Sequence, residues 1–565
     1  MNSRAETSRA PAPRPVVSSE SVARLPRWPL WLLCVAYVLP GYLGRDPWTG
    51  DGQTFGVAWQ IAQGHSGWLQ PTLWGHSVGG GWLAYWLGAL ALKAFAGWLG
   101  APTASRLPFM LLLAACLAEV WHAAYQLALR DEAQPVQPAF GEAIVRKDYA
   151  RAMADGALLS LLACLGLLVR GHETTPALVQ LAGAGSVLLG LALLPRRRLR
   201  ACLALAGGLL GLALCGAPWL ALFAALLVAA LLPAPTLRGS RAAAAGTLVL
   251  CMAACGAVLW HVHGATEARI PTLRSAQHLL GVLAWFLWPA WPLAGWAIWR
   301  WRASLGAWHV LAPVALGTLC LFSAFLSSSG SAPLLLVLPA AAVLTSLALP
   351  VMRRGSLAAL DWFALMFFSL LAFVVWLLWI ALLTGEPAHP AANIARLAPG
   401  FHARLQPLPT LLALLATAAW AGVAAWRAGR HRHPIWKGMV LSAGGVTLVW
   451  ALVGTLWLPV LDYASSYRNL GEQVRLALRE HGAGPAPRVQ TLGLNPSQQG
   501  LLGYWSDAHF VPGAWPQSWR APYVLTLTRG DYLPWPVRGQ VLWSGHRPGE
   551  NDELLRLWRR DDAQR

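Results

Sequence analysis

The first apolar segment of the chain is followed by a polar loop that reads Gly44-Arg45-Asp46-Pro47-Trp48-Thr49-Gly50-Asp51-Gly52-Gln53-Thr54-Phe55-Gly56. The loop runs on to a turn, Gly67-Trp68-Leu69-Gln70-Pro71, and is enclosed by segments hydrophobic enough to enter a membrane. Its two carboxylates are costly beside a bilayer unless they are paired or act on a bound molecule. We therefore expect a membrane protein whose working site begins at this loop.

Composition indicates an integral membrane protein. Of the 565 residues, 56% are hydrophobic and 12% are charged, whereas soluble domains carry about 25% charged residues. The formal net charge of +19 comes from basic clusters set between apolar runs, which is the usual marking of cytoplasmic loops. Membrane orientation thus explains the charge, and the pattern argues against a nucleic-acid-binding protein.

Long apolar stretches recur along the chain and predict membrane-spanning helices. They lie near 28–44, 82–98, 107–128, 152–170, 176–194, 199–215, 217–234, 243–262, 276–299, 306–326, 332–350, 357–383, 407–426 and 437–460, and each approaches the ~20 residues that cross a hydrocarbon core. We interpret 82–98, which follows Gly79-Gly80-Gly81, as an interfacial or re-entrant element. The predicted fold is an all-α polytopic membrane bundle of about 13 transmembrane helices.

The basic clusters also set the expected orientation. Arg196-Arg197-Arg198, Arg353-Arg354 and the run 427–437 are among the clusters that fall after every second span, so these loops are expected inside. The predicted domains are a disordered basic cytoplasmic N-terminus, 1–27, a transmembrane domain, 28–461, and an outer domain, 462–565. Within the transmembrane domain, 45–106 is expected to form the first outer loop with interfacial helices.

After Asp462 the sequence changes to the pattern of a small α/β domain. The runs 488–492, 523–527 and 540–543 predict strands, 468–480 predicts an amphipathic helix, and Pro and Gly turns separate these pieces. None of the eight cysteines lies in this tail, and their spacing matches neither a zinc site nor a disulfide framework. No metal ligands are predicted, and a divalent metal ion stays open as a cofactor.

The outer loops hold side chains that suit transfer of a group from a lipid phosphate. A carboxylate can act as general base, and cations can stabilise a departing phosphate. The candidate carboxylates are Asp51, Asp46 and Glu173, and the candidate cations are Arg269, Arg274 and His278. Each has a plainer interpretation, because Asp51 can cap a helix, Asp46 suits a turn and Glu173 suits a helix start. The arginines can also contact lipid headgroups.

Several motifs, in order along the membrane part, resemble the family-39 type glycosyltransferases of the GT-C fold. That group includes protein O-mannosyltransferases and the aminoarabinose transferases of lipid A. The matching elements are Asp51 with Gly67-Trp68-Leu69-Gln70-Pro71, then Tyr85-Trp86-Leu87, Arg106-Leu107-Pro108, Glu173 at the head of a span, and Gly207 to Pro218.

The resemblance implies a bacterial inner-membrane enzyme that takes a sugar from an undecaprenyl-phosphate donor. The acceptor would lie in the periplasm, as lipid A, another glycan or protein, and the tail would be a periplasmic domain. Asp51 would be the general base, with Glu173 and Asp46 as further catalytic carboxylates. Arg269, Arg274, His278 and Arg45 would bind the donor phosphate, and His172 and Tyr85 would serve the acceptor or other contacts.

The sequence also departs from the family. Where the arabinose transferases carry Glu-Lys-Pro-Pro, this chain has Gly79-Gly80-Gly81-Trp82, and Cys215 stands where the family has a lysine before a glycine. Either Arg269 and Arg274 replace those lysines, or the donor differs, or the activity is impaired. A transporter or flippase of a lipid-linked intermediate, or a non-catalytic scaffold derived from the enzyme, remains the alternative.

Overall fold

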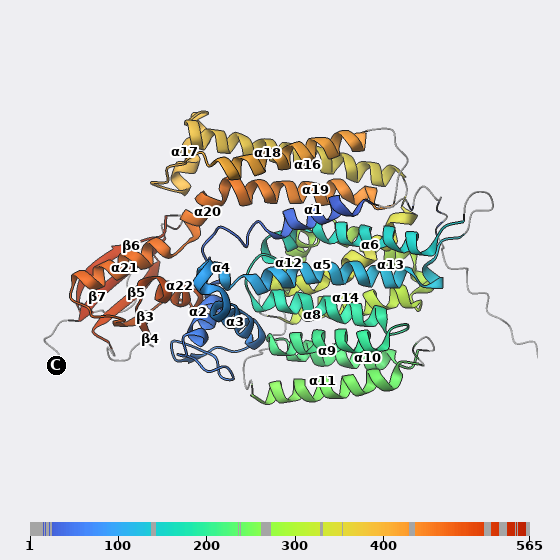
Figure 1. The fold of residues 1–565 in the computed structure, drawn as a ribbon, viewed down its shortest axis with the longest axis horizontal. Coiled ribbons are helices and arrows are strands. Elements are labelled where there is room, and N and C mark those ends of the chain that lie inside the picture. The colour runs from blue at the N-terminus through green and yellow to red at the C-terminus, as the bar shows by residue number, and fades with distance from the viewer. Residues whose placement is uncertain are drawn as a thin grey trace, which may run out of the picture.

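The computed structural model describes residues 15, 17, 22, 25–136, 143–234, 237, 239–261, 273–327, 331–352, 354–428, 435–512, 521–529, 539–548, 550 and 552–560. Most of the described helices run side by side in a bundle, and a domain with a β-sheet projects from one end of it (Figure 1). Nearly all of the predicted disordered segment, 1–27, lies outside the described residues.

The bundle is built from helices that follow one another along the chain. They are α1 (Arg27–Val38), α5 (Leu107–Ala128), α6 (Arg146–Leu162), α7 (Leu165–Arg170), α8 (Pro176–Leu193), α9 (Arg198–Leu214), α10 (Pro218–Leu231), α11 (Arg241–His261), α12 (Leu273–Phe286), α13 (Ala290–Arg300), α14 (Trp308–Leu326), α15 (Leu338–Ala348), α16 (Arg354–Thr384), α18 (Pro407–Ala428) and α19 (Lys437–Leu452). Short 3₁₀ segments are η2 (Asp131–Ala133), η4 (Arg302–Ser304), η5 (Ala332–Val337) and η6 (Leu349–Val351). The helix α17 (Ala388–Leu397) joins α16 to α18 at the sheet-bearing end (Figure 1).

Within the described part of the chain, nine helices are long and apolar enough to cross a membrane. The number is ten if the bent pair Ala276–Phe286 and Ala290–Arg300 counts as one span, and Arg27–Val38 and Pro218–Leu231 are shorter apolar helices. This is fewer than the about 13 predicted from segment length. The segment 28–44 shows one reason, since its helix has 12 residues and ends at Val38, before Pro40 and the positive-φ Gly41. The chain is an integral multi-pass membrane protein.

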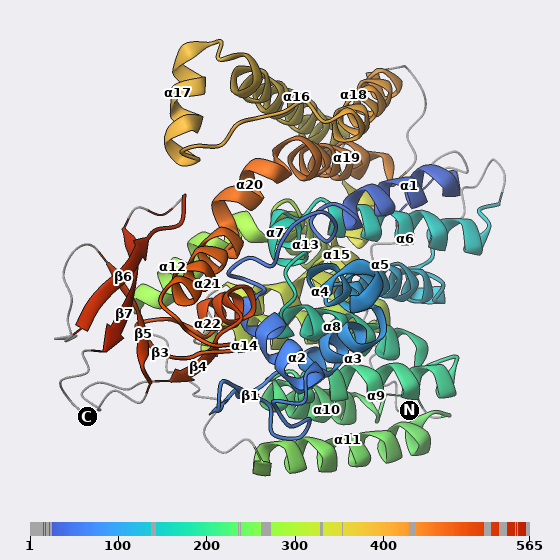
Figure 2. The same ribbon diagram turned by 60° about the vertical axis from the view of Figure 1, so that its left-hand side comes forward.

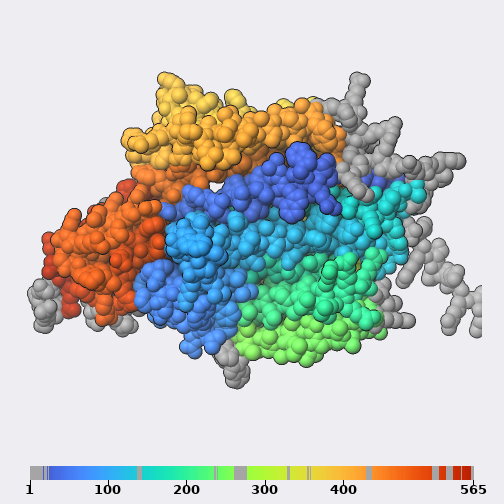
Figure 3. Space-filling view, in the orientation of Figure 1, coloured from blue at the N-terminus to red at the C-terminus, as the bar shows by residue number. Residues whose placement is uncertain are grey.

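Among the described residues, two separate hydrophobic cores hold the molecule together. The larger core lies inside the bundle. The second joins helices of the first loop, α2 (Gly52–Ala62) and α3 (Trp82–Leu99), to the C-terminal domain, with Phe55 beside Leu501 and Leu557 in the same cluster. The space-filling view shows the blue first-loop segment pressed against the orange and red C-terminal domain, with α16 to α18 forming a ridge along one side (Figure 3).

The segment predicted to be interfacial, 82–98, forms α3. By length and composition it is one of the nine candidate spans, but its buried face, including Tyr85 and Ala89, belongs to the second core. It lies with α2 and α4 (Ala101–Ala104) at the sheet-bearing end, near the small antiparallel pair β1 (Thr72–Leu73) and β2 (His76–Ser77) (Figure 2). Its interfacial position stays a prediction.

A continuous helical rod leads from the bundle into the C-terminal domain. After α19 the helix widens into a π-helical turn, η7 (Val453–Trp457), and continues as α20 (Leu458–Ser465). Pro459 explains the wide turn, because a proline lacks the N–H that would bond the carbonyl four residues back, at Thr455, and its ring would clash with that carbonyl. The rod then reaches α21 (Arg468–Glu480).

The C-terminal domain is a mixed five-stranded sheet with two helices. The strand order is β4-β3-β5-β7-β6, with β3 parallel to both neighbours and β7 antiparallel to both of its neighbours. The elements are α21, β3 (Arg488–Leu492), α22 (Pro496–Ser506), β4 (His509–Pro512), β5 (Tyr523–Arg529), β6 (Gly539–Gly545) and β7 (Glu553–Arg560). The bounds of α21 and β3 coincide with the predicted runs 468–480 and 488–492, whereas β4, β7 and α22 were not predicted.

The helix α22 lies directly on α2. A Cβ atom on Gly56 of α2 would stand 2.6 Å from the Cα of Gly500 on α22, so only glycines allow this approach. The start of α22 is fixed by a capping box, in which the Asn495 side chain accepts from the Gln498 amide and the Gln498 side chain accepts from the Asn495 amide. The C-terminal domain is thereby held against the first loop.

Candidate active site

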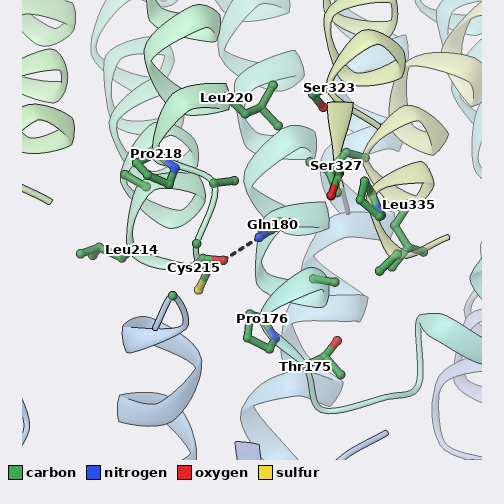
Figure 4. A pocket seen from close by; sticks show the side chains of 18 of the residues that line it. Thr175, Pro176, Gln180, Leu214, Cys215, Pro218, Leu220, Ser323, Ser327 and Leu335 are labelled. Carbon is green, nitrogen blue, oxygen red and sulfur yellow. Dashed lines mark hydrogen bonds between the residues drawn. The ribbon is translucent and has the colours of Figure 1, made fainter. Parts of the chain in front are cut away.

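A cavity of about 980 Å³ lies where the first loop, the bundle and the C-terminal domain meet. Its polar lining residues include Gln53, Thr54, Tyr85, Arg170, Glu173, Thr175, Gln180, Ser323, Ser327 and Ser497, and its apolar ones include Pro218, Trp219, Leu220, Phe223, Phe322 and Leu335. Figure 4 shows Gln180 reaching across to the turn after α9, where its amide donates to the carbonyl of Cys215 at 2.6 Å. The cavity wall therefore combines hydroxyl and amide groups with apolar side chains.

Among the described lining residues, the only charged ones are Glu173 and Arg170. One guanidinium nitrogen of Arg170 donates to both carboxylate oxygens of Glu173, at 2.9 and 3.2 Å. The Glu173 side chain is 20% exposed and the Arg170 side chain 41%. Burial raises the pKa of Glu173 above its ordinary value, and Arg170 only partly offsets this effect. A carboxyl group with a raised pKa in a cavity is a plausible proton acceptor.

Asp51, the expected general base, is buried beneath this cavity wall and is not among the described residues that line it. One oxygen accepts from Arg45 Nη1 at 2.5 Å and from the Trp48 amide at 3.1 Å. The other accepts from the amide and the hydroxyl of Thr174 at 2.7 and 3.0 Å. Burial alone would raise the pKa of Asp51, but Arg45, Arg106 and these hydrogen bonds hold it below the ordinary value. The carboxylate thus ties the first loop to the residue that follows Glu173.

Two arginines fix the backbone around Asp51. Besides its ion pair, Arg45 donates to the carbonyls of Gly41, Asp46 and His172 at 2.5, 3.2 and 3.1 Å. Arg106 donates to the carbonyls of Tyr42 and Arg45 at 3.2 and 2.5 Å. Both side chains are buried, so Arg45, expected at the donor phosphate, has its hydrogen-bonding groups directed at the protein instead.

Asp46 connects the first loop to α20. Its amide donates to Asp462 Oδ1 at 2.8 Å, and its carboxylate accepts from the Ser466 hydroxyl at 2.9 Å. The indole of Trp48 donates to the same Asp462 oxygen at 2.9 Å. Like Asp51, Asp46 lies outside the described lining of the cavity, and its contacts join two parts of the fold.

His172 and Tyr85, expected as acceptor contacts, lie in different places. The ring of His172 is buried among Tyr37, Tyr42 and Trp450, and its nitrogens stand 2.7 and 2.9 Å from the carbonyl oxygens of Leu168 and Tyr37. Burial lowers its pKa to about 4, although both carbonyls favour the charged ring. Tyr85, in contrast, lines the cavity, and its hydroxyl lies 3.4 Å from the Gln53 amide nitrogen that donates to it.

The predicted phosphate-binding residues are only partly described. Arg269 lies outside the described residues, and the Arg274 side chain is likewise outside them, although its backbone lies in the first turn of α12. His278 is exposed and lines a second, open groove of about 600 Å³ together with Arg170, Trp285 and Phe286. Within the described residues, no group of three His, Cys, Asp or Glu side chains could hold a metal ion.

Sequence reasoning missed Arg170, Thr174, Gln180 and Asp462. Arg170 precedes Glu173 by three residues, a spacing that favours an ion pair, so its pairing carried a local signal. Thr174 and Asp462 carried no local signal, because Thr174 is 123 positions from Asp51 and Asp462 is 416 positions from Asp46.

Fold and cavity together define a class, the polytopic helical membrane proteins whose mixed β-domain covers a cavity at one end of the bundle. The fold is similar to that of ArnT from Cupriavidus metallidurans. The structure of that protein bound to undecaprenyl phosphate matches with a TM-score of 0.58 at 13% identity, over 94% of this chain and 98% of that one. Its apo structure matches with a TM-score of 0.60 at 14% identity, over 94% and 96%. No protein-family model and no curated protein sequence matches the chain significantly.

Proposed function

We propose that this protein is an integral inner-membrane glycosyltransferase that moves a sugar from an undecaprenyl-phosphate donor to a periplasmic acceptor. The observation that carries the proposal is the cavity whose charged pair, Glu173 and Arg170, faces an otherwise neutral wall of hydroxyl, amide and apolar groups. Amides and hydroxyls suit a sugar, and the apolar lining residues suit the prenyl chain. The fold likeness to a protein bound to undecaprenyl phosphate supports the donor class.

In this proposal Glu173 is the general base, and Asp51 is its support. Glu173 lies in the cavity with a raised pKa, whereas Asp51 uses both oxygens in hydrogen bonds and an ion pair. A base must be within reach of the proton that it removes, so the role first given to Asp51 passes to Glu173. Asp46 shares the supporting role through Asp462 and Ser466.

The donor phosphate is proposed to enter near α12, where Arg269, Arg274 and His278 remain its expected contacts. His278 supports this placement, since it lines the groove that also reaches Arg170. Arg45 is withdrawn from the phosphate because its N–H groups serve backbone carbonyls and Asp51.

The proposed topology keeps the N-terminus in the cytoplasm and the C-terminal domain in the periplasm, with about 13 crossings. Contacts among the basic turns support it. Arg196 donates to the carbonyl of Leu129 at 3.1 Å, and a Cβ on Gly239 would meet the guanidinium of Arg198 at 2.6 Å. These turns after α5, α8 and α10 therefore lie together on one face of the bundle.

The test is a transfer assay with the purified full-length chain in vesicles that contain undecaprenyl-phosphate-linked sugars and extracted lipid A. We expect release of undecaprenyl phosphate together with a sugar-modified acceptor, both measured by mass spectrometry. A comparison of envelope glycoconjugates from cells with and without the gene identifies the acceptor. If the protein carries the labelled donor across the vesicle membrane without cleaving it, the flippase alternative replaces this proposal.

A further inference from the structure

Arg170 lies between the cavity and the open groove. Its side chain lines the cavity that holds Glu173, and it also lines the open groove between α7 and α12. Apart from Arg170, His278 and Ser331, the described residues of that groove are glycines and apolar side chains, with Trp285 72% exposed. A charged group at the junction of an apolar groove and a polar cavity is placed to meet the head of a lipid whose chain lies in the groove.

The present partner of Arg170 is exchangeable. Its ion pair with Glu173 is partly exposed, at 41% and 20%, and pairs of that kind contribute little to stability. A phosphate group offers several acceptor oxygens to the guanidinium, and Arg–phosphate contacts are among the strong charge-assisted hydrogen bonds. An incoming lipid phosphate can therefore compete with Glu173 for the same guanidinium.

We propose that Arg170 leaves Glu173 for the phosphate of the incoming donor, so that the carboxylate loses its ion pair and becomes a stronger base only when the donor is bound. This inference rests on the proposed function and adds a substrate-triggered step to it. Arg170 thereby acts twice, first as the partner that holds Glu173 and then as the cation that stabilises the leaving phosphate.

The charges that face Glu173 determine how its basicity changes. Burial raises the pKa of Glu173 most. Arg170 of α7 lowers this pKa, and in the first loop Arg45 also lowers it while Asp51 raises it. His278 of α12 lines the groove together with Arg170, and Tyr85 of α3 and Cys215 after α9 are the other titratable side chains among the described residues of the cavity wall. When Arg170 turns to a phosphate, the main lowering influence is lost and a negative charge arrives nearby, so the pKa of Glu173 rises further. General bases work best when their pKa lies near the working pH.

The chemical step balances without any further reagent. The acceptor oxygen forms a bond to the anomeric carbon, and its proton passes to Glu173. The bond between that carbon and the phosphate oxygen breaks, and its electron pair stays on the polyprenyl phosphate beside Arg170. Glu173 then releases the proton to water, which restores the carboxylate and its pair with Arg170.

The experiment measures proton uptake when a lipid phosphate binds to the full-length protein in detergent. The probe is farnesyl methyl phosphate, a phosphodiester like the donor that keeps one negative charge over the whole pH range used, and farnesol is the uncharged control. In weak buffer above pH 4.5, the ordinary value for this group, we expect the wild-type protein to take up protons when the phosphodiester binds and none when farnesol binds. The affinity for the phosphodiester should rise as the pH falls through the same window, because the bound state holds Glu173 protonated to higher pH.

Three variants separate this mechanism from simple charge attraction. Glu173→Gln should bind the probe without proton uptake. Arg170→Gln should bind it about tenfold to a hundredfold more weakly, the effect of losing one charge-assisted contact, and Arg170→Lys should restore part of the affinity. Arg547→Gln is the matched control, since Arg547 pairs with Glu550 at the same three-residue spacing in the C-terminal domain, and it should behave as the wild type.

Equal proton uptake by the wild-type protein and Glu173→Gln would overturn the proposal, as would undiminished binding by Arg170→Gln. If either result is obtained and the protein still transfers sugar, the proposed function stands and only the exchange of partners by Arg170 is contradicted. Proton uptake that follows the expected pattern in a protein that never transfers sugar would instead contradict the proposed function and keep the exchange.

Discussion

Gly80 and Gly216 touch backbone to backbone at the edge of the cavity. A Cβ on Gly80 would lie 2.9 Å from the Cα of Gly216, and both residues have positive φ, +59° and +84°. Gly80 precedes α3 and Gly216 follows α9, so the two places where the sequence departs from the resembled family, Gly79–Trp82 and Cys215, are neighbours in space. A side chain at either glycine would meet the backbone of the other.

Replacing Gly216 should loosen this contact and the cavity with it. Gly216→Ala combines an unfavourable backbone conformation, which costs about 1–2 kcal/mol, with a clash against the Gly80 backbone. Gly64→Ala is the matched control, because Gly64 has φ +80° but nothing within 4 Å of its added Cβ. In thermal unfolding in detergent, Gly216→Ala should have the lower midpoint, and equal midpoints would show that the contact is not tight.

Asp51→Asn should destabilise the protein. Removing one partner of a buried ion pair costs about 3–5 kcal/mol, and Asp51 and Arg45 are both buried. Asp131→Asn also breaks an ion pair, with Arg146, but the Asp131 side chain is 83% exposed. This substitution should therefore change the unfolding midpoint little. If Asp51→Asn unfolds like the wild type yet loses transfer, Asp51 is the base after all.

The same pair gives stability a pH dependence with a fixed sign. The pKa of Asp51 is lowered in the folded protein from its ordinary 3.8, so its contribution is fully present above pH 3.8 and is lost as the pH falls through the folded value. The difference in unfolding midpoint between the wild type and Asp51→Asn should therefore shrink under acid conditions. A difference that stays constant down to low pH would contradict the ion pair.

Glu173→Gln should nearly abolish sugar transfer without harming the fold. Loss of a general base lowers a rate by on the order of a hundredfold to ten-thousandfold, while glutamine keeps the size of the side chain in the cavity. Glu550→Gln, which removes the carboxylate of the equally spaced Arg547 pair, should leave transfer unchanged. A Glu173→Gln protein that retains more than about a tenth of the wild-type rate would falsify the assignment.

The proposed topology predicts opposite labelling of two introduced cysteines. Glu480→Cys, at the exposed end of α21, should react with an impermeant thiol reagent in intact spheroplasts, and Arg197→Cys, in the exposed turn before α9, only after the membrane is permeabilised. The eight native cysteines are buried or half-buried, so background labelling should be low. Reversed labelling would move the cavity to the cytoplasmic face.

The sequence predicted those elements whose signal is local. The apolar runs became helices, and β3 and α21 begin and end at the predicted residues because alternation and amphipathic spacing are written into short windows. The strand β7 was missed because Arg556, Arg559 and Arg560 disguise its alternation, although Leu555 and Leu557 are buried.

The site was harder to predict from the sequence, because its key contacts join distant parts of the chain. The motif around Asp51 drew attention to the first loop, but whether Asp51 lines a cavity or is enclosed by hydrogen-bond partners depends on Thr174, 123 positions away. The pKa directions likewise depend on the assembled fold, because burial raises the pKa of Glu173, whereas Arg45, Arg106 and the Thr174 hydrogen bond lower that of Asp51.

The seating of α22 on α2 has a consequence for how the protein is made. Ser497 of α22 lines the cavity, and the indole of Trp74 donates to the carbonyl of Gln499, 425 positions later in the chain. During synthesis the first loop therefore stays uncovered by α22 until almost all of the described chain has left the ribosome. The Gly56–Gly500 approach then closes the cavity as one of the last assembly events. A nascent chain therefore has no complete cavity until its C-terminal domain has folded against the first loop.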